Sequence, residues 1–269
     1  MKSKVIAISV VAVLVWCGVW ATAHSAGIEN SQGIDGLVLE GSINQAAYVL
    51  GEPVRARFQF VNESGSAVSV PSRGVEVGSL KILISEKVDG EYKEYVGAGW
   101  GTLRGRPVEL KPGSTHAYSE VSILWNGKPN LPNFSEEELK QALRGRLATE
   151  YAFDKPGIYW LKGLSFAGKS LDPIESRAIP IEIKEPMGED AAVWRRIKGN
   201  REIAYLIQQA AFDTDVGSKK QALIEDVEQI IVEHPGSVYS KYLQPNLDKF
   251  KAAELRRNEA MRKAVVRDN

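Results

Sequence analysis

The chain has 269 residues, of which 43% are hydrophobic and 25% charged, so its composition is that of a globular protein. Its 34 Lys and Arg residues balance 34 Asp and Glu residues, and a chain without net positive charge lacks the field that gathers nucleic acid. The only cysteine, Cys17, lies in an apolar N-terminal run, which excludes a disulfide framework, thiolate–metal sites and a cysteine nucleophile from the rest of the chain.

The N-terminus has the pattern of a secretory signal. Lys2 and Lys4 precede the apolar residues 5–20, and small residues of the kind that signal peptidase accepts follow at 21–26. We therefore expect residues 1–26 to be a signal peptide, and the protein to be periplasmic or secreted. Without Lys2 and Lys4, 32 basic residues face 34 acidic ones, a net charge of −2. The alternative is an uncleaved anchor in the inner membrane, because the apolar run approaches the ~17–20 residues that span a bilayer.

Strand patterns with a period of two follow this segment. In residues 54–60 (VRARFQF) apolar side chains alternate with polar ones, which is typical of a strand with one buried and one solvated face. Residues 80–84 repeat the alternation, as do the isoleucines of residues 179–183. Pro180 cannot donate a hydrogen bond to a neighbouring strand, so we expect the strand that contains it to lie at an edge.

A helical pattern interrupts the strands near residues 135–147. Ser135 and Glu138 form a capping box, and leucines follow at the helical spacing of positions 139, 143 and 147. The three acids at 136–138 could bind a cation, but acids in a first turn also stabilise the helix dipole, which is the interpretation we adopt. We therefore expect a short helix inserted here.

The segment Lys155-Pro156-Gly157-Ile158-Tyr159 places a tyrosine after a turn, at the start of a late strand. Together with residues 48–54 (YVLGEPV) and the turn at 110–113 (LKPG), it resembles the immunoglobulin-like and fibronectin-like domains of exported bacterial proteins. The resemblance implies that Tyr159 forms a tyrosine corner, whose hydroxyl bonds back to the backbone, with Pro156 and Gly157 as its turn. The Cys-Trp-Cys pattern of antibody domains is absent, so only the general architecture is implied: an all-β sandwich over residues 27–185.

The apolar period changes to that of a helix beyond Pro186, so residues 187–269 form an all-α segment in this interpretation. We expect breaks at Gly199-Asn200 and at His234-Pro235, and a kink at Pro245. Residues 218–250 resemble a tetratricopeptide-type helix pair. One or two such pairs cannot bury a core alone, so the helices must pack on the sandwich or on a partner.

Catalytic and cofactor motifs are absent from the sequence. It contains no metalloprotease, serine hydrolase, phosphate-loop or dinucleotide signature, and we predict no catalytic, metal-binding or cofactor-binding residues. His116 and His234 lack a second histidine or an acid at ligand spacing and are interpreted as turn residues. His24 lies at the end of the predicted signal.

Candidate binding residues lie in and just after the glycine-rich stretch at 97–101. Trp100, Arg104 and Arg106 are of the types enriched in binding hot spots, although a flexible loop is the simpler interpretation. Residues 251–267 carry six basic and two acidic residues, a net charge of +4. A helix end of this kind is either solvated or bound to lipid.

These features favour a non-enzymatic envelope protein that binds another envelope protein, with no nucleic-acid partner. Association with the membrane would use the N-terminal segment or the basic tail. One alternative is a protease inhibitor, because small immunoglobulin-like sandwiches of bacteria include inhibitors. The second is a membrane-anchored protein whose N-terminal helix stays uncleaved. The sequence leaves the partner and the oligomeric state open.

Overall fold

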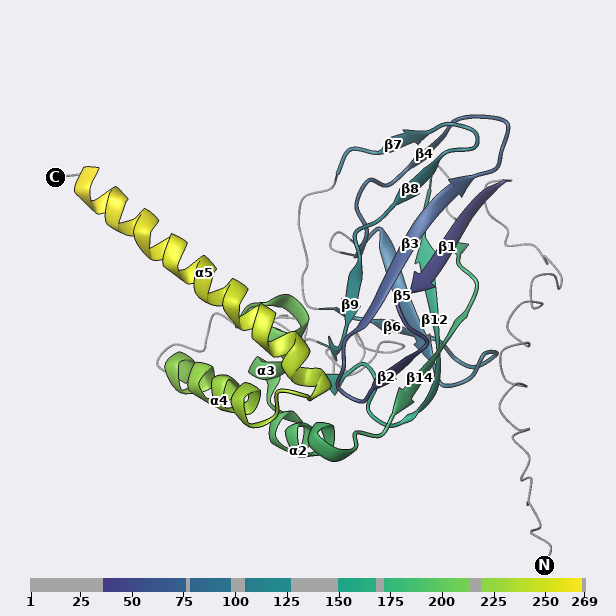
Figure 1. Cartoon of the computed structure of the whole chain (residues 1–269). Coiled ribbons are helices and arrows are strands. Elements are labelled where there is room, and N and C mark those ends of the chain that lie inside the picture. Colours follow the sequence, from purple (N-terminus) through teal and green to yellow (C-terminus); the bar gives the residue numbers. More distant parts are fainter. Residues whose placement is uncertain are drawn as a thin grey trace, which may run out of the picture. The chain divides into compact units, whose positions relative to one another are not determined.

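The computed structural model describes residues 36–75, 78–97, 105–126, 150–167, 172–212 and 219–267 (Figure 1). The predicted signal peptide and the predicted helix near residues 135–147 lie outside the described residues. In the part that is described, a β-rich region precedes four helices, and both belong to one unit, Gln32–Asn269. The predicted succession of strands and then helices is therefore confirmed.

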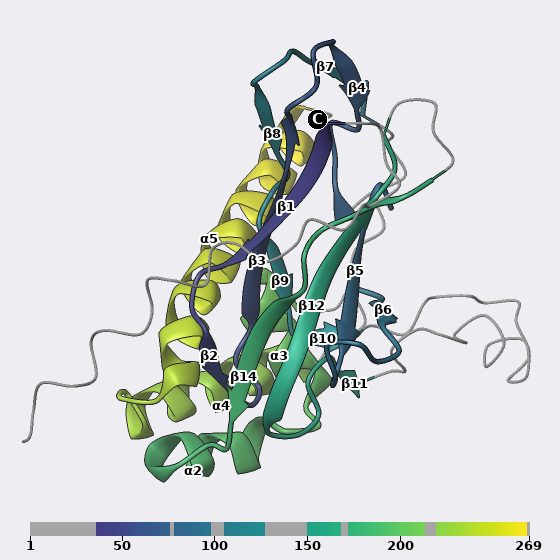
Figure 2. The same cartoon turned by 90° about the vertical axis from the view of Figure 1, so that its right-hand side faces the viewer.

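The described strands form two larger open sheets and two short pairs (Figure 2). The first sheet has the order β1-β3-β8, with β9 also on β3, and its strands are β1 (Leu37–Ile43), β3 (Val54–Asn62), β8 (Thr115–Ala117) and β9 (Val121–Ile123). The second has the order β2-β14-β12-β5-β6, with β13 on β12; its strands are β2 (Ala47–Val49), β5 (Leu80–Ser85), β6 (Lys93–Tyr95), β12 (Gly157–Ser165), β13 (Ile174–Glu175) and β14 (Ile179–Lys184). The pairs are β4 (Val68–Val70) with β7 (Val108–Leu110), and β10 (Trp125–Asn126) with β11 (Glu150–Tyr151).

The alternation predicted for residues 54–60 is confirmed in β3. Phe58 and Phe60 are buried, whereas Arg55 and Arg57 between the apolar positions are exposed. β5 likewise buries Leu80, Ile82 and Ile84. Successive side chains of a strand point to opposite faces, so each sheet contributes one apolar face to the core.

The inner faces of both sheets contribute to one hydrophobic core. Phe58 of β3 lies between two glycines of other strands. A Cβ atom added to Gly41 of β1 would stand 2.7 Å from the Phe58 ring, and one added to Gly163 of β12 would stand 2.5 Å from it. Glycine at both positions therefore lets the phenylalanine fill the space between the strands.

The prediction that Pro180 marks an edge strand is wrong. β14 lies between β2 and β12, so it is an inner strand of its sheet. The pairing with β2, however, covers only Glu182 to Lys184 of β14, while Pro180 faces Trp160 of β12. Proline is tolerated because the parallel strand β2 begins only opposite Glu182, which leaves no ladder bond on that side for Pro180 to donate.

The helices of the described part are α2 (Gly188–Ile197), α3 (Arg201–Gln209), α4 (Lys220–Glu233) and α5 (Val238–Arg267). The predicted breaks are confirmed: the Asn200 side chain accepts the backbone N–H groups of Glu202 and Ile203 to cap α3, and α4 ends just before His234-Pro235. Pro245 lies inside α5, which continues through it. Among the described helices, none combines the length and the apolarity needed to span a membrane.

The helices share a second core that includes side chains of the β-rich region. Val193, Ile203, Leu206 and Leu243 are buried in it together with Leu124, which follows β9. Two tyrosines of α5 bond to the segment between β2 and β3: the Tyr239 hydroxyl donates to the Leu50 carbonyl oxygen at 2.5 Å, and that of Tyr242 donates to Glu52 Oε1 at 2.8 Å. The helices therefore pack on the β-rich region, one of the two arrangements that the sequence predicted.

Gln208 of α3 makes a second polar connection. Its amide Nε2 donates to the Tyr95 hydroxyl at 2.7 Å and to the Ser122 carbonyl oxygen at 3.0 Å, and its Oε1 accepts the Trp125 backbone N–H at 3.0 Å. Both polar atoms of the Gln208 amide, Nε2 and Oε1, are thus hydrogen-bonded to the β-rich region. These bonds fix the position of α3 against β6, β9 and β10.

Candidate binding site

Arg106 is the one predicted binding residue that lies in the described part of the chain. It is exposed, just before β7. Trp100 and Arg104 lie outside the described residues. The structure therefore places one residue of the candidate loop, and the surroundings of Arg106 define the candidate site.

An open cavity of about 370 Å³ is lined by Gly105 and Pro107, the two neighbours of Arg106. Its other walls come from the segment that joins β4 to β5 and from Phe166, which follows β12. Three segments far apart in the sequence thus meet at one end of the β-rich region. The volume lies within the range of ligand pockets, about 300–1,000 Å³.

Strand pairing brings two of these walls together. β4 and β7 are antiparallel, with Val68 opposite Leu110 and Val70 opposite Val108, so the residues after β4 lie beside those before β7. Gly105 approaches its neighbour so closely that an added Cβ would stand 2.1 Å from Ser72 Oγ. A side chain at position 105 would require the side chains of Ser72 and Arg73 to move.

A buried hydrogen-bond chain holds the third wall. Ser165 Oγ donates to the Ser79 carbonyl oxygen at 2.6 Å and therefore accepts from the Tyr118 hydroxyl, which lies 3.2 Å away. Ser79 lines the cavity, and Phe166 directly follows Ser165. Because Ser165 and Tyr118 are buried, these bonds connect the cavity wall to the rigid core.

The exposed groups at this end are apolar, hydroxylic and cationic. Phe166 is 41% exposed, and the hydroxyls of Ser69 and Ser72 and the guanidinium of Arg73 belong to lining residues. Arg106 is exposed between two lining positions but does not line the cavity itself. No carboxylate and no histidine occurs among the lining residues that the structure describes. The arrangement suits a ligand that combines an apolar side chain with hydrogen-bond acceptors or an acid.

The two described histidines lie apart from this cavity. His116 of β8 faces Phe60 across the strand pair, and its ring packs edge to face on Tyr118, with 5.9 Å between the centroids. Its buried Nε2 atom has no hydrogen-bond partner within the described residues, and His234 ends α4. Across those same residues, no three His, Cys, Asp or Glu side chains are grouped to hold a metal ion.

Tyr159 makes the contact expected of a tyrosine corner. Its hydroxyl lies 2.9 Å from the Lys155 carbonyl oxygen, to which it donates, and 3.3 Å from Asp154 Oδ1. Burial, followed by the nearby Asp154 charge, raises the pKa of Tyr159 to about 12. Pro156 precedes β12 and Gly157 begins it, so these two residues form the turn that the hydroxyl spans.

Sequence reasoning missed the buried carboxylate of Glu52. Its Oε1 accepts from Gln45 Nε2 at 2.8 Å as well as from Tyr242, and its Oε2 accepts the Val49 backbone N–H at 2.9 Å. The Gly-Glu-Pro sequence identified only a turn, because the tyrosine that makes the glutamate part of the junction lies 190 residues away. These bonds give Glu52 a structural role.

Comparisons with known proteins identify no family for this chain. No family model and no curated protein matches it. The sporulation control protein Spo0M of Bacillus subtilis is similar at 9% identity over 66% of this chain and 55% of its own, with a TM-score of 0.29. The bacterial hydrophobin BslA is similar at 10% identity over 57% of this chain and 97% of its own, with a TM-score of 0.22. The chain spans about half the length of Spo0M, and TM-scores this low carry neither fold nor function over to it.

Proposed function

We propose that this chain is an exported, non-enzymatic module of the bacterial cell envelope, which binds another envelope protein at the cavity beside Arg106. The partner would insert an apolar side chain next to Phe166 and place an acid or a carbonyl group on the guanidinium of Arg106, beside the cavity. The observation that carries the proposal is the meeting of three loop segments, held by strands and by the Tyr118–Ser165–Ser79 bonds, around an exposed aromatic ring. Loops on a rigid scaffold are where binding residues concentrate.

The proposal includes an immunoglobulin-like sandwich as the scaffold. Its support is the core shared by the inner faces of the two sheets and the hydrogen bond from Tyr159 to Lys155. In domains of this class, binding loops cluster at the ends of the sheets. The cavity lies at such an end, because Ser79 directly precedes β5 and Phe166 directly follows β12.

Export is the part of the proposal that rests on sequence alone. The basic residues, the apolar run and the small residues within positions 1–26 support a cleaved signal. The mature protein should then begin near residue 24 or 27. N-terminal sequencing of native material decides this, because an intact N-terminus from Met1 would indicate the anchored alternative.

Capture of partners from the native envelope tests the binding surface. Arg106→Glu and Phe166→Ser should each reduce the amount of cross-linked partner relative to wild type. Lys87→Glu is the matched control, since it reverses an exposed cation in the turn after β5, at the opposite end of that strand from Ser79. Equal capture by wild type and both cavity variants would overturn the proposed site. A captured protease that the protein inhibits would support the inhibitor alternative instead.

A further inference from the structure

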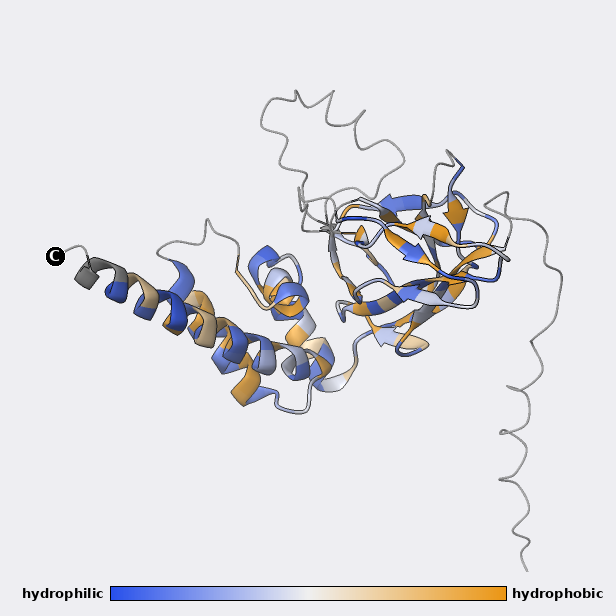
Figure 3. Ribbon diagram, turned by 90° about the horizontal axis from the view of Figure 1, so that it is seen from above, coloured by the Kyte–Doolittle hydropathy of each residue, from blue (hydrophilic) through white to orange (hydrophobic). Residues whose placement is uncertain are grey.

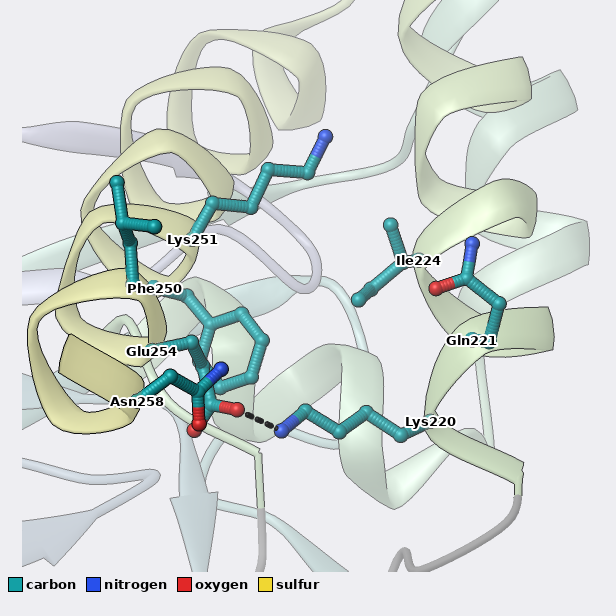
Figure 4. A pocket seen from close by; sticks show the side chains of 8 residues that line it. Lys220, Gln221, Ile224, Phe250, Lys251, Glu254 and Asn258 are labelled. Carbon is teal, nitrogen blue, oxygen red and sulfur yellow. Dashed lines mark hydrogen bonds and ion pairs between the residues drawn. The ribbon is translucent and has the colours of Figure 1, made fainter. Parts of the chain in front are cut away.

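A groove of about 620 Å³ lies between α4 and α5, on a different surface from the cavity (Figure 4). Both helices contribute apolar and charged side chains to it: Ile224 and Lys220 from α4, and Phe250, Lys251, Glu254 and Leu255 from α5. The lining therefore combines apolar side chains with two ammonium groups and one carboxylate.

Two ion pairs between the helices hold this groove in shape. Lys220 bonds to Glu254, and Lys251 bonds to Glu228. The Lys220 ammonium also lies 5.0 Å from the centroid of the Phe250 ring, which packs edge to face on Phe212. The groove is thus preformed, which reduces the entropy that a ligand must lose on binding.

The C-terminal half of α5 continues beyond the other helices (Figures 1 and 3). Every residue from 251 to 263 is exposed except Glu254, which is half-buried. The apolar side chains of Leu255 and Met261 are 62% and 50% exposed. A helix that is polar around its whole circumference either connects separate bodies or is weakly stable. Binding of another molecule at the start of this segment would therefore stabilise the helix.

Charge identifies the kind of ligand. Residues 251–263 contain five basic and two acidic residues, a net charge of +3, whereas the whole chain is neutral. An acidic ligand is attracted to such a segment, and the attraction weakens as salt is added. The exposed Leu255 adds a requirement for an apolar group, because it lines the groove and faces solvent in the free protein.

A protein segment fits this surface better than a membrane does. A helix that lies in a lipid interface needs one continuous apolar face. Leu255 and Met261 are six positions apart, which places them about 120° apart around the helix, and Asn258 and Arg262 lie in the arc between them. The basic residues therefore surround the helix and do not border a single apolar stripe.

We propose that the groove between α4 and α5 binds an acidic segment of a partner protein, with an apolar side chain of that segment packed on Leu255. This site goes beyond the proposed function, since it uses neither Arg106 nor Phe166. Either site can fail its test while the other holds.

The test uses the full mature chain and a fluorescein-labelled peptide of alternating Glu and Leu, followed by fluorescence anisotropy. We expect saturable binding that weakens with added salt. Leu255→Ser should weaken it about tenfold, because it removes an apolar contact without disturbing the core. The double substitution Arg256→Glu and Arg257→Glu should also weaken binding, because it removes positive charge that attracts the acidic peptide.

The matched control is Val232→Ser, which removes an apolar side chain that is 79% exposed on α4 and does not line the groove. Its affinity for the peptide should equal that of wild type. Absence of saturable binding to the wild-type chain, or an equal loss in Val232→Ser and Leu255→Ser, would overturn the proposal. Binding to phosphatidylglycerol vesicles without binding to the peptide would also overturn it and indicate a lipid surface.

Discussion

Trp194 of α2 lies directly against the backbone of Gly51, the residue that turns the chain from β2 towards β3. A Cβ atom added to Gly51 would stand 2.2 Å from Trp194 Cζ3, and Gly51 has a φ of +87°, which residues with side chains rarely adopt. The other surroundings of the indole are aromatic: it packs edge to face on Tyr151 and stacks on Tyr239. The contact between the helices and the strands thus depends on the absence of a side chain at Gly51.

Substitution of Gly51 by alanine should destabilise the protein strongly. Overpacking lowers the free energy of unfolding by about 1–3 kcal/mol. The left-handed backbone conformation lowers it by about 1–2 kcal/mol more when the residue has a side chain. Gly113→Ala provides the control, because Gly113 has a φ of +72° but nothing within 4 Å of the added Cβ. Urea denaturation of both variants should show the larger loss for Gly51→Ala. Equal losses would mean that the Trp194 contact contributes nothing beyond the strain.

The helical segment should not fold without the strands. Residues 187–269 expressed alone lose Leu124, Trp125 and Tyr151, which complete the helical core. They also lose the hydrogen bonds of Gln208 and Tyr239 to the β-rich region. Circular dichroism of this fragment should show weak helicity and no cooperative thermal transition. A cooperative transition would identify the helices as an independent domain.

Removal of the Tyr159 hydroxyl should cost about 1–3 kcal/mol, the usual effect of losing a buried hydrogen bond. Tyr159→Phe would leave the Lys155 carbonyl oxygen without its partner. Tyr92→Phe removes a hydrogen bond to Val88 at the surface and should cost less than about 0.5 kcal/mol. A denaturation midpoint of Tyr159→Phe that matches wild type would show that the corner does not stabilise the fold.

Stability should fall at alkaline pH, and Tyr159 should contribute to the fall. Its pKa is about 12 in the folded protein and about 10 in an unfolded chain, so its contribution is present below pH 10 and lost as the pH rises towards 12. Urea midpoints measured between about pH 9 and pH 12 should decrease less in Tyr159→Phe than in wild type. Some decrease should remain, because burial also raises the pKa of Tyr95 and Tyr151. Identical decreases would contradict this contribution.

Local features of the fold could be predicted from the sequence. The alternation in β3 identified its buried face, and the residues Asn200 and His234-Pro235 identified two helix ends. These signals depend on side-chain direction and backbone restriction over a few residues. Neighbouring positions in the sequence were therefore enough to find them.

Long-range relationships could not be predicted in this way. Asp190 Oδ1 of α2 accepts the Val238 backbone N–H at 2.7 Å and the Ser237 hydroxyl at 2.8 Å, so the first turn of α2 caps α5, which begins 48 residues after Asp190. The parallel pairing of β2 with β14 likewise joins distant segments, so the missing N–H of Pro180 could not reveal that β14 is an inner strand. Residue type alone identified Arg106 as a candidate. No local signal identifies Phe166, which lies in the wall of the cavity.

Site-specific photo-cross-linking tests the proposed binding surface most directly. p-Benzoylphenylalanine would replace Phe166, which is 41% exposed, and in a separate variant Val88, which is 44% exposed in the turn between β5 and β6. After irradiation in the native envelope, the Phe166 position should form a covalent adduct with a discrete partner protein, and the Val88 position should not. Adducts of the same size from both positions, or none from position 166, would contradict binding at this cavity.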